Sequence, residues 1–267
     1  RITILDNHIN FNNSPIGDII ISAQDIGSTA FDWFLVAADI EAIPGGIPCT
    51  ITMTAGTEDY PYQVSQNISL DLTLSQFGFP LDGIVVKSSP IVADLNSDGI
   101  KEIYFGSDNE ALHGYNSYGE EIDGFPFQST DRVRSSPAIG DVDNDGSMEI
   151  VFGNSSGKLY IISDDGTREL AYTLLGFIEG APALVDVDGD QDLEIIFTTT
   201  TTSGGHVYVI HHNGITMSGF PKELGSMWAG PAVQDIDNDG IVDIICATYD
   251  KEIYALEANG GVIKSGF

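Results

Sequence analysis

The sequence predicts an all-β fold: a β-propeller with four visible four-stranded blades, preceded by part of an immunoglobulin-like β-sandwich. From residue 78 onward the chain repeats itself, and Pro90, Pro137, Pro182 and Pro231 mark equivalent points 45 to 49 residues apart. Each repeat consists of short β-branched and aromatic runs bounded by glycine and proline, which are typical of strands. Four antiparallel strands repeated at this period are typical of propeller blades.

Residues 1–77 carry no repeat, but their apolar residues alternate in the manner of strands. We interpret this segment as the latter part of an immunoglobulin-like sandwich, so the predicted domain boundary lies between residues 77 and 78. The Pro-Gly-Gly-Ile-Pro run at 44–48 is expected to be a turn. The expected strands are residues 2–11, 16–23, 33–38, 50–55 and 68–74.

The second repeat displays the expected blade most clearly, and no helix is needed to account for it. Its strands are expected at residues 135–142, 149–153, 158–163 and 169–174. Radial packing of such sheets buries both faces of each blade. The four repeats extend over about residues 78–126, 127–175, 176–221 and 222–267.

An alternating acidic pattern follows the first expected strand of each repeat. Ca²⁺ takes six to eight oxygen ligands, which carboxylates at positions one, three, five and nine and a backbone carbonyl at position seven can supply. The pattern therefore predicts up to four Ca²⁺ ions. The expected ligands are Asp94, Asn96, Asp98, Ile100 and Glu102 in loop one (94–102); Asp141, Asp143, Asp145, Ser147 and Glu149 in loop two (141–149); Asp186, Asp188, Asp190, Asp192 and Glu194 in loop three (186–194); and Asp235, Asp237, Asp239, Ile241 and Asp243 in loop four (235–243).

The EF-hand is the main alternative for this pattern, but it requires a bidentate glutamate at position twelve and a helix on either side. Position twelve is Phe105, Phe152, Phe197 and Cys246 in the four loops, and none of these residues chelates calcium. Each loop is therefore expected to join two strands.

The four loops differ in charge and in the position of glycine. Loops two and four keep all four acids and a glycine at position six, so we expect them to bind calcium most tightly. Loop one has one charge fewer because of Asn96, which weakens its attraction for a cation. Loop three has Gly189 at position four and Gln191 at position six, so its backbone is expected to turn less readily.

The chain carries 10 basic and 40 acidic residues, which gives a formal net charge of −30. This excess argues against a nucleic-acid backbone or an anionic membrane as a partner. Four bound Ca²⁺ ions would reduce the charge to about −22, and the remaining excess is typical of a solubilising extracellular surface. No apolar run reaches the ~18 residues of a membrane span, and no signal peptide is visible.

Two further features concern the chain as a whole. Cys49 and Cys246 fall in different predicted domains, and we expect two buried, unpaired thiols. The chain starts at Arg1 without Met and stops at Gly266-Phe267, where other repeats read Gly-Phe-Pro. We therefore expect a piece of a longer, processed polypeptide.

The repeats resemble the FG-GAP or VCBS repeats, calcium-binding propeller repeats best known from integrin α-chains. Phe105-Gly106 and Phe152-Gly153 match the first half of the name FG-GAP, and Gly180-Ala181-Pro182 matches the second half. The resemblance covers residues 78–267. The layout is also similar to non-catalytic regions of secreted bacterial multidomain proteins, some of which carry a subtilisin-like peptidase.

Propellers of the integrin type have seven blades, whereas four are visible in this chain. Three possibilities remain open at this point. Further blades follow residue 267, four blades close alone, or an open sheet edge pairs with another chain.

Catalysis finds little support in the sequence. The pattern Gly153-Asn-Ser155-Ser-Gly157 matches a nucleophile elbow, but it lies where a hairpin turn is expected instead of a strand running into a helix. The three histidines at positions 206, 211 and 212 lie at an expected exposed strand end and lack the Cys or Glu spacing of a zinc site.

We therefore predict a secreted or cell-surface, calcium-binding, non-catalytic module for protein or carbohydrate binding or adhesion. One alternative is an accessory region of a secreted subtilisin-like peptidase or polysaccharide-degrading enzyme. Another is a structural subunit of an extracellular assembly, joined through open sheet edges.

A candidate ligand face follows from positions that differ among similar repeats. Three residues before each marker proline stand Lys87, Arg134, Glu179 and Trp228. Because the chain then runs through a strand to its calcium loop, these residues are expected to cluster on the face opposite the loops. They are either partner-binding residues or merely tolerant surface positions, and Trp228 and Arg134 are the strongest candidates for contact with a partner.

Overall fold

The computed structural model describes residues 2–4, 9–10, 16–17, 37–38, 45–56, 61–72 and 78–264. The chain divides into two compact units, Arg1–Gln76 and Phe77–Phe267, and each is described by itself. All described elements are strands, so the predicted all-β class is confirmed. None of the described elements is an apolar helix of membrane-spanning length.

The first unit contains an antiparallel sheet with the strand order β3-β1-β5-β6. A second, two-stranded sheet pairs β2 with β4. The immunoglobulin-like topology of this unit stays a prediction. The strands are β1 (Ile2–Ile4), β2 (Ile9–Asn10), β3 (Ile16–Gly17), β4 (Ala37–Ala38), β5 (Gly45–Gly56) and β6 (Pro61–Leu72).

The turn predicted at residues 44–48 is wrong, because β5 already begins at Gly45. From Gly45 opposite Leu72 to Gly56 opposite Pro61, every residue of β5 has a partner in β6. Glycine and proline predict turns from local propensity alone, and here a pairing partner of equal length overrides that propensity.

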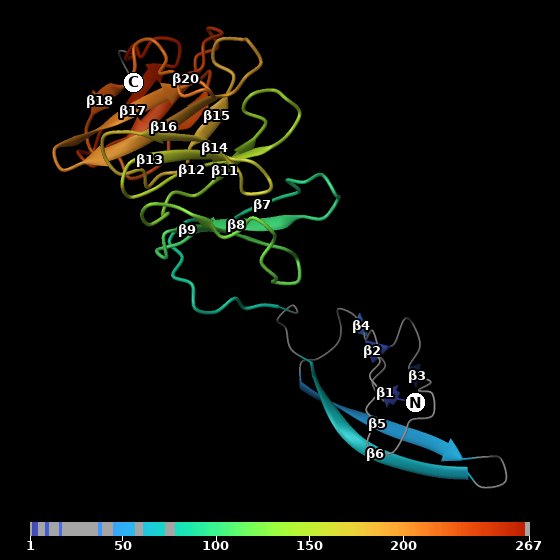
Figure 1. Cartoon of the computed structure of the whole chain (residues 1–267). Coiled ribbons are helices and arrows are strands. Elements are labelled where there is room, and N and C mark those ends of the chain that lie inside the picture. The colour runs from blue at the N-terminus through green and yellow to red at the C-terminus, as the bar shows by residue number, and fades with distance from the viewer. Residues whose placement is uncertain are drawn as a thin grey trace. The chain divides into compact units, whose positions relative to one another are not determined.

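The second unit consists of successive antiparallel sheets, one for each repeat (Figure 1). The first sheet has β7 (Ile91–Ala93), β8 (Glu102–Gly106), β9 (Ala111–Tyr115) and β10 (Phe127–Gln128). The second has β11 (Ala138–Gly140), β12 (Glu149–Gly153), β13 (Lys158–Ile162) and β14 (Arg168–Thr173). The third has β15 (Ala183–Val185), β16 (Glu194–Thr201), β17 (Gly204–Ile210) and β18 (Lys222–Leu224). The fourth has β19 (Ala232–Gln234), β20 (Asp243–Ala247) and β21 (Ile253–Glu257).

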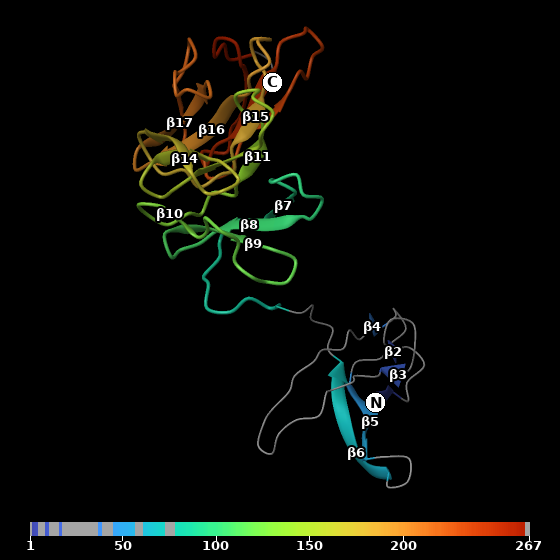
Figure 2. The same cartoon turned by 45° about the vertical axis from the view of Figure 1, so that its right-hand side comes forward.

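The strands of the second repeat agree with the sequence, except that β11 is shorter than the expected strand at 135–142. The repeat limits differ slightly from expectation. β10 lies at residues 127–128, beyond the expected end of the first repeat, and pairs with β9 (Figure 2). β18 lies in the same way beyond residue 221 and pairs with β17. In the fourth sheet, the described residues contain three strands and an isolated bridge between Leu256 and Ile263.

The first strands of the last three sheets lie side by side, as in a propeller. β11 contacts β15, and β15 contacts β19.

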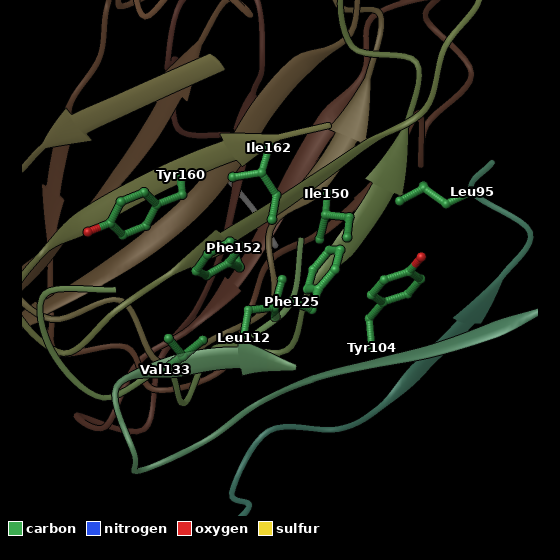
Figure 3. Packing of buried hydrophobic residues seen from close by; sticks show 9 residues of the cluster. All are labelled: Leu95, Tyr104, Leu112, Phe125, Val133, Ile150, Phe152, Tyr160 and Ile162. Carbon is green, nitrogen blue, oxygen red and sulfur yellow. The ribbon is translucent and has the colours of Figure 1, made fainter. Parts of the chain in front are cut away.

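Apolar side chains fill the space between successive sheets. In the cluster between the first and second sheets, the rings of Phe152 and Tyr160 stack with centroids 5.2 Å apart. Phe127 meets Phe152 edge-on at 5.8 Å. Figure 3 shows the nine buried side chains of this cluster: Leu95, Tyr104, Leu112, Phe125, Val133, Ile150, Phe152, Tyr160 and Ile162. Phe152, at position twelve counted from the start of loop two, is thus a core residue of the blade interface.

The glycines of the two Phe-Gly pairs lie where the chain of the next repeat crosses a sheet. A β-carbon added at Gly153 would lie 2.2 Å from Cγ2 of Ile178, and one added at Gly106 would lie 2.4 Å from the carbonyl oxygen of Val133. The absence of a side chain therefore lets successive repeats pack directly against one another.

Gly153→Ala is expected to lower the free energy of unfolding by about 1–3 kcal/mol, because an extra methyl group in a packed interface forces neighbouring atoms to shift. Urea denaturation of the purified chain measures the change. Gly260→Ala is the control, since a β-carbon there meets no atom within 4 Å. Equal stability of the two variants would contradict the close approach at Gly153.

Candidate calcium centre

The four acidic loops occupy the same place in four sheets, between the first and second strands. Their backbones share two left-handed residues. At position four, φ is 58° for Ser97, 56° for Asn144 and 60° for Asn238. At position six, φ is 87° for Gly99, 95° for Gly146 and 87° for Gly240. Each loop therefore needs a left-handed residue at both positions, of which the sequence analysis considered only the second.

Loop three reaches the same conformation with its residue types exchanged. Gly189 at position four has φ of 83°, and Gln191 at position six has φ of 81°. Loop three therefore makes the same turn as the other three loops. The glycine has moved from one left-handed position to the other, and Gln191 takes the left-handed conformation that usually favours glycine.

Gln191→Gly is expected to raise the free energy of unfolding by about 0.5–1 kcal/mol. The left-handed conformation of a non-glycine residue costs roughly 1–2 kcal/mol, and glycine removes this strain. Glycine also increases the conformational entropy of the unfolded chain, which offsets part of the gain. Thermal denaturation in the presence of calcium measures the effect. Gln234→Gly in β19 is a control that should destabilise, and a loss of stability in both variants would refute the argument.

The first aspartate of each loop fixes the turn through backbone hydrogen bonds. In loop two, the N–H groups of Asp145 and Gly146 each donate to a different carboxylate oxygen of Asp141 at 3.0 Å. Loops one and four repeat this arrangement on Asp94 and Asp235. In loop three the donors to Asp186 are the N–H groups of Gly189 and Gln191. The loops are thus ordered by their own residues.

The carboxylate at position nine is the buried member of each loop. Glu102, Glu149, Glu194 and Asp243 are at most 4% exposed. Each accepts the N–H of the residue at position two, at distances from 2.7 to 3.3 Å. Burial raises the pKa of Glu149 to about 7, and it also raises the pKa of Glu102 and Glu194.

The carboxylates of three loops converge closely enough to share a cation. Ligand oxygens from Asp141, Asp143 and Glu149 in loop two lie within 4.8 Å of one another. The first three aspartates of loop three and of loop four form similar groups. The described acids of loop one form no such group, and there the Asn96 amide donates to Asp98 at 3.3 Å.

The donor set fits a calcium ion. Oxygen ligands suit a hard cation, and a buried carboxylate needs a positive partner. Glu149 is 2% exposed, and no lysine, arginine or histidine within residues 78–264 forms an ion pair with it. Calcium would be held by the carboxylates at positions one, three, five and nine and by the carbonyl at position seven, namely Ile100, Ser147, Asp192 and Ile241, and Asn96 would contribute its amide oxygen in loop one.

Two histidines lie against loop three, which the sequence analysis missed. Nδ1 of His211 is 2.9 Å from Oε1 of Glu194, and Nδ1 of His212 is 2.9 Å from Oδ2 of Asp192. His211 and His212 directly follow the end of β17, as expected, but they are half-buried instead of exposed, because the pairing of β16 with β17 places them beside the loop. A 17-residue separation in sequence hides this contact from any local spacing rule.

A lysine lies against loop four, and the sequence analysis missed this contact as well. Nζ of Lys264 is 2.7 Å from Oδ2 of Asp237 and 2.9 Å from Oδ1 of Asp243. These neighbouring carboxylates raise the pKa of Lys264, with the hydrogen bond to Asp237 as the largest cause. Loop four therefore differs from loop two in having a positive charge of its own.

The residues of the candidate ligand face lie at the other end of the strands, but three of them are already paired. Arg134 donates to both oxygens of Asp108, at 2.7 and 3.2 Å, and Lys87 lies 3.3 Å from the same carboxylate. Arg134 holds the pKa of Asp108 at about 2. Glu179 accepts a hydrogen bond from Ser155 at 3.0 Å.

Trp228 is 53% exposed and differs from these three residues because its side chain forms no hydrogen bond or ion pair within residues 78–264. Asp108 and Ser155 belong to the turns that follow β8 and β12, at the ends of these strands away from the acidic loops. Arg134 and Glu179 therefore join successive repeats at that end. Among the four residues, Trp228 is therefore the exposed side chain whose contacts are not already used within the propeller unit.

Two other motifs have the structural roles that the sequence indicates. The Gly153–Gly157 stretch forms the turn between β12 and β13, so Ser155 does not stand on a nucleophile elbow. Cys246 is a free and buried thiol. The side chain of Cys49 lies outside the described residues.

The comparisons with known proteins concern the repeats and the fold. The family model of the FG-GAP-like repeat matches residues 94–152 and 186–246. Each stretch contains two successive acidic loops and the strands between them. These two stretches are FG-GAP-like repeats. No curated protein sequence matches the chain.

Solved structures similar to the second unit are propellers. BBS1N, in a complex with ARL6DN soaked with lead, aligns with a TM-score of 0.51 at 14% identity, over 69% of this chain and 56% of that chain. BamB from Moraxella catarrhalis gives a TM-score of 0.44 at 22% identity, over 67% of this chain and 51% of that chain. This chain thus spans about half the length of these two structures, and the likeness to BBS1N shows the propeller fold alone.

Proposed function

We propose that the chain is a calcium-stabilised, non-catalytic binding module of a secreted or cell-surface protein. The observation that carries the proposal is the fourfold repetition of one loop geometry with a buried carboxylate at position nine. Acidic side chains held this close repel one another unless a cation lies between them. The FG-GAP-like repeats and the propeller fold support a binding role.

Calcium is proposed to act in folding and not in chemistry. It neutralises the carboxylates that each loop gathers and joins the ends of two strands. At ~1 mM free calcium and a dissociation constant of ~0.1 mM, each site contributes about 1.4 kcal/mol to the stability of the folded state.

Calorimetric titration of the metal-free chain with calcium tests this proposal and ranks the loops. Asp143→Ala should remove the tightest binding step, because loop two has all four acids and a buried, unpaired charge at Glu149. Asp98→Ala should remove a weaker step, since loop one has about tenfold lower affinity for want of one carboxylate. Asp123→Ala, an exposed acid outside the loops, is the control. The proposal fails if the chain takes up no calcium, and the ranking fails if the two loop variants exchange their effects.

The partner is proposed to be a protein or a carbohydrate that contacts the strand ends around Trp228. BBS1N, which shares the fold, was crystallised with the protein ARL6DN. Large exposed aromatic residues are frequent anchors in interfaces. A net charge of −30 makes nucleic acid and anionic membranes poor partners.

Panels of extracellular proteins and glycans, probed with the calcium-loaded chain, test the binding role. Trp228→Ala should reduce any binding found there by tenfold or more, as expected for an interface anchor worth about 2 kcal/mol. Tyr118→Ala is the matched control, because Tyr118 is a comparably exposed aromatic residue near the acidic loops. Equal losses in both variants would point away from Trp228.

Two alternatives remain distinguishable by experiment. Reproducible hydrolase or lyase turnover that one point mutation abolishes would identify an enzyme. Sedimentation at rising protein concentration tests the structural-subunit alternative, since self-association through a sheet edge would increase the sedimenting mass. A chain that stays monomeric at every concentration would exclude this alternative.

A further inference from the structure

Lys264 stands at a position that is apolar in two other repeats. Its N–H donates to the carbonyl of Ala255 at 2.9 Å. Ile122 in the first repeat and Met217 in the third make the equivalent backbone bond, to Gly114 and Val209, at 3.0 and 2.9 Å. Both of these side chains pack against an apolar cluster. The fourth repeat therefore has a lysine where its relatives contribute to the core.

The Lys264 side chain extends into loop four instead. Its ammonium nitrogen contacts the carboxylates of Asp237 at 2.7 Å, Asp243 at 2.9 and 3.1 Å, and Asp239 at 3.4 Å. The lysine side chain is only 14% exposed, and that of Asp243 is fully buried. One ammonium thus meets the acids at positions three, five and nine.

This contact is confined to one loop within residues 78–264. No lysine or arginine in that range forms an ion pair with the acids of loops one, two or three. Loop four has acids at the same four positions as loop two, although its acid at position nine is the shorter Asp243 where loop two has Glu149. Lys264 is the feature that gives loop four a cation of its own.

An ammonium group and a calcium ion cannot use the same oxygens at once. Calcium at loop four would need the carboxylates of Asp237, Asp239 and Asp243, and these are the groups that Lys264 contacts. Two cations at this distance would also repel each other strongly. Metal binding therefore requires the lysine side chain to leave.

We propose that Lys264 is a built-in cation for loop four, which holds the loop together without metal and competes with calcium for it. The proposal rests on the proposed calcium function of the other loops. It predicts that loop four binds calcium more weakly than loop two, whereas the sequence analysis ranks the two loops equally. It also predicts that calcium binding at loop four frees the Lys264 side chain from its carboxylates.

Lys264→Met is the decisive variant, because methionine is the residue of the third repeat at the equivalent position. In calorimetric titration with calcium, this variant should gain one binding step that is about tenfold tighter or more than in the unmodified chain. Adding Asp237→Ala should abolish the gain, which assigns it to loop four. Lys222→Met, whose lysine forms no ion pair within the described residues, is the control and should leave every step unchanged.

A second readout needs no calcium binding. In excess EGTA, Lys264→Met should melt at a lower temperature than the unmodified chain, because three carboxylates lose their positive partner. Unchanged calcium steps together with an unchanged melting temperature in EGTA would overturn the proposal. Failure of the calcium function is a separate result, since it would appear as the absence of the step that Asp143→Ala removes.

Discussion

Chelation of calcium is expected to lower the melting temperature of residues 78–267 by about ten degrees or more. Three loops that each contribute ~1.4 kcal/mol give about 4 kcal/mol, and a domain of this size loses ~2–4 °C for each kcal/mol. Loop four adds less if Lys264 already occupies its carboxylates. Residues 1–77 have no such loop, so their transition should stay nearly unchanged.

Differential scanning calorimetry with 1 mM calcium and then with excess EGTA measures this effect. Calcium added back beyond the capacity of the chelator is the control and should restore the original transition. Magnesium should restore less, because its small size and strict octahedral geometry suit these flexible oxygen sites poorly. If the transitions coincide under all conditions, calcium is not a structural ion of this chain.

Phe152→Ala is expected to lower the free energy of unfolding by about 3–5 kcal/mol, the usual cost of deleting a buried aromatic ring. Phe152 is completely buried between the first and second sheets and stacks on Tyr160 (Figure 3). Phe127 meets its ring edge-on. The cavity would lie at the interface of two repeats, so both should be loosened together.

Urea denaturation at saturating calcium separates this loss from any change in metal binding. Phe177→Ala is the matched control, because the Phe177 side chain is 41% exposed and should cost far less. The exchange of amide hydrogens in β8 and β12 should increase in Phe152→Ala alone. Similar stabilities of the two variants would disprove the central place of Phe152 in the core.

The sequence predicts those features that arise from short-range patterns. The repeat period predicts the sheets, and the position of each acidic run predicts a loop between two strands. Phe152 shows why this works, since it lies in the short apolar run that directly follows loop two, and this run forms the buried strand β12. The turn predicted at residues 44–48 shows the limit, because local propensity carries no information about the partner strand.

The remaining features depend on contacts between distant residues. Lys264 and Asp237 are 27 residues apart, and no spacing rule joins them. The histidines beside loop three escaped notice for the same reason. The conformation of loop three was missed for a different reason. A fixed glycine position was assumed, although each loop has two left-handed positions and glycine can stand at either of them.

The two ends of the interface between the first and second repeats are expected to respond differently to salt. At the end that contains Asp108, Arg134 of the second repeat forms an ion pair with this aspartate of the first repeat. Lys87, whose side chain is 52% exposed, pairs with the same carboxylate. Added salt screens such exposed charges, with a Debye length near ~10 Å at 0.1 M ionic strength and ~3 Å at 1 M. At the opposite end lie the acidic loops, where a calcium ion bound as proposed would be held by direct coordination, which salt screens less. High salt and a calcium chelator are therefore expected to weaken the contact between the first and second repeats at opposite ends.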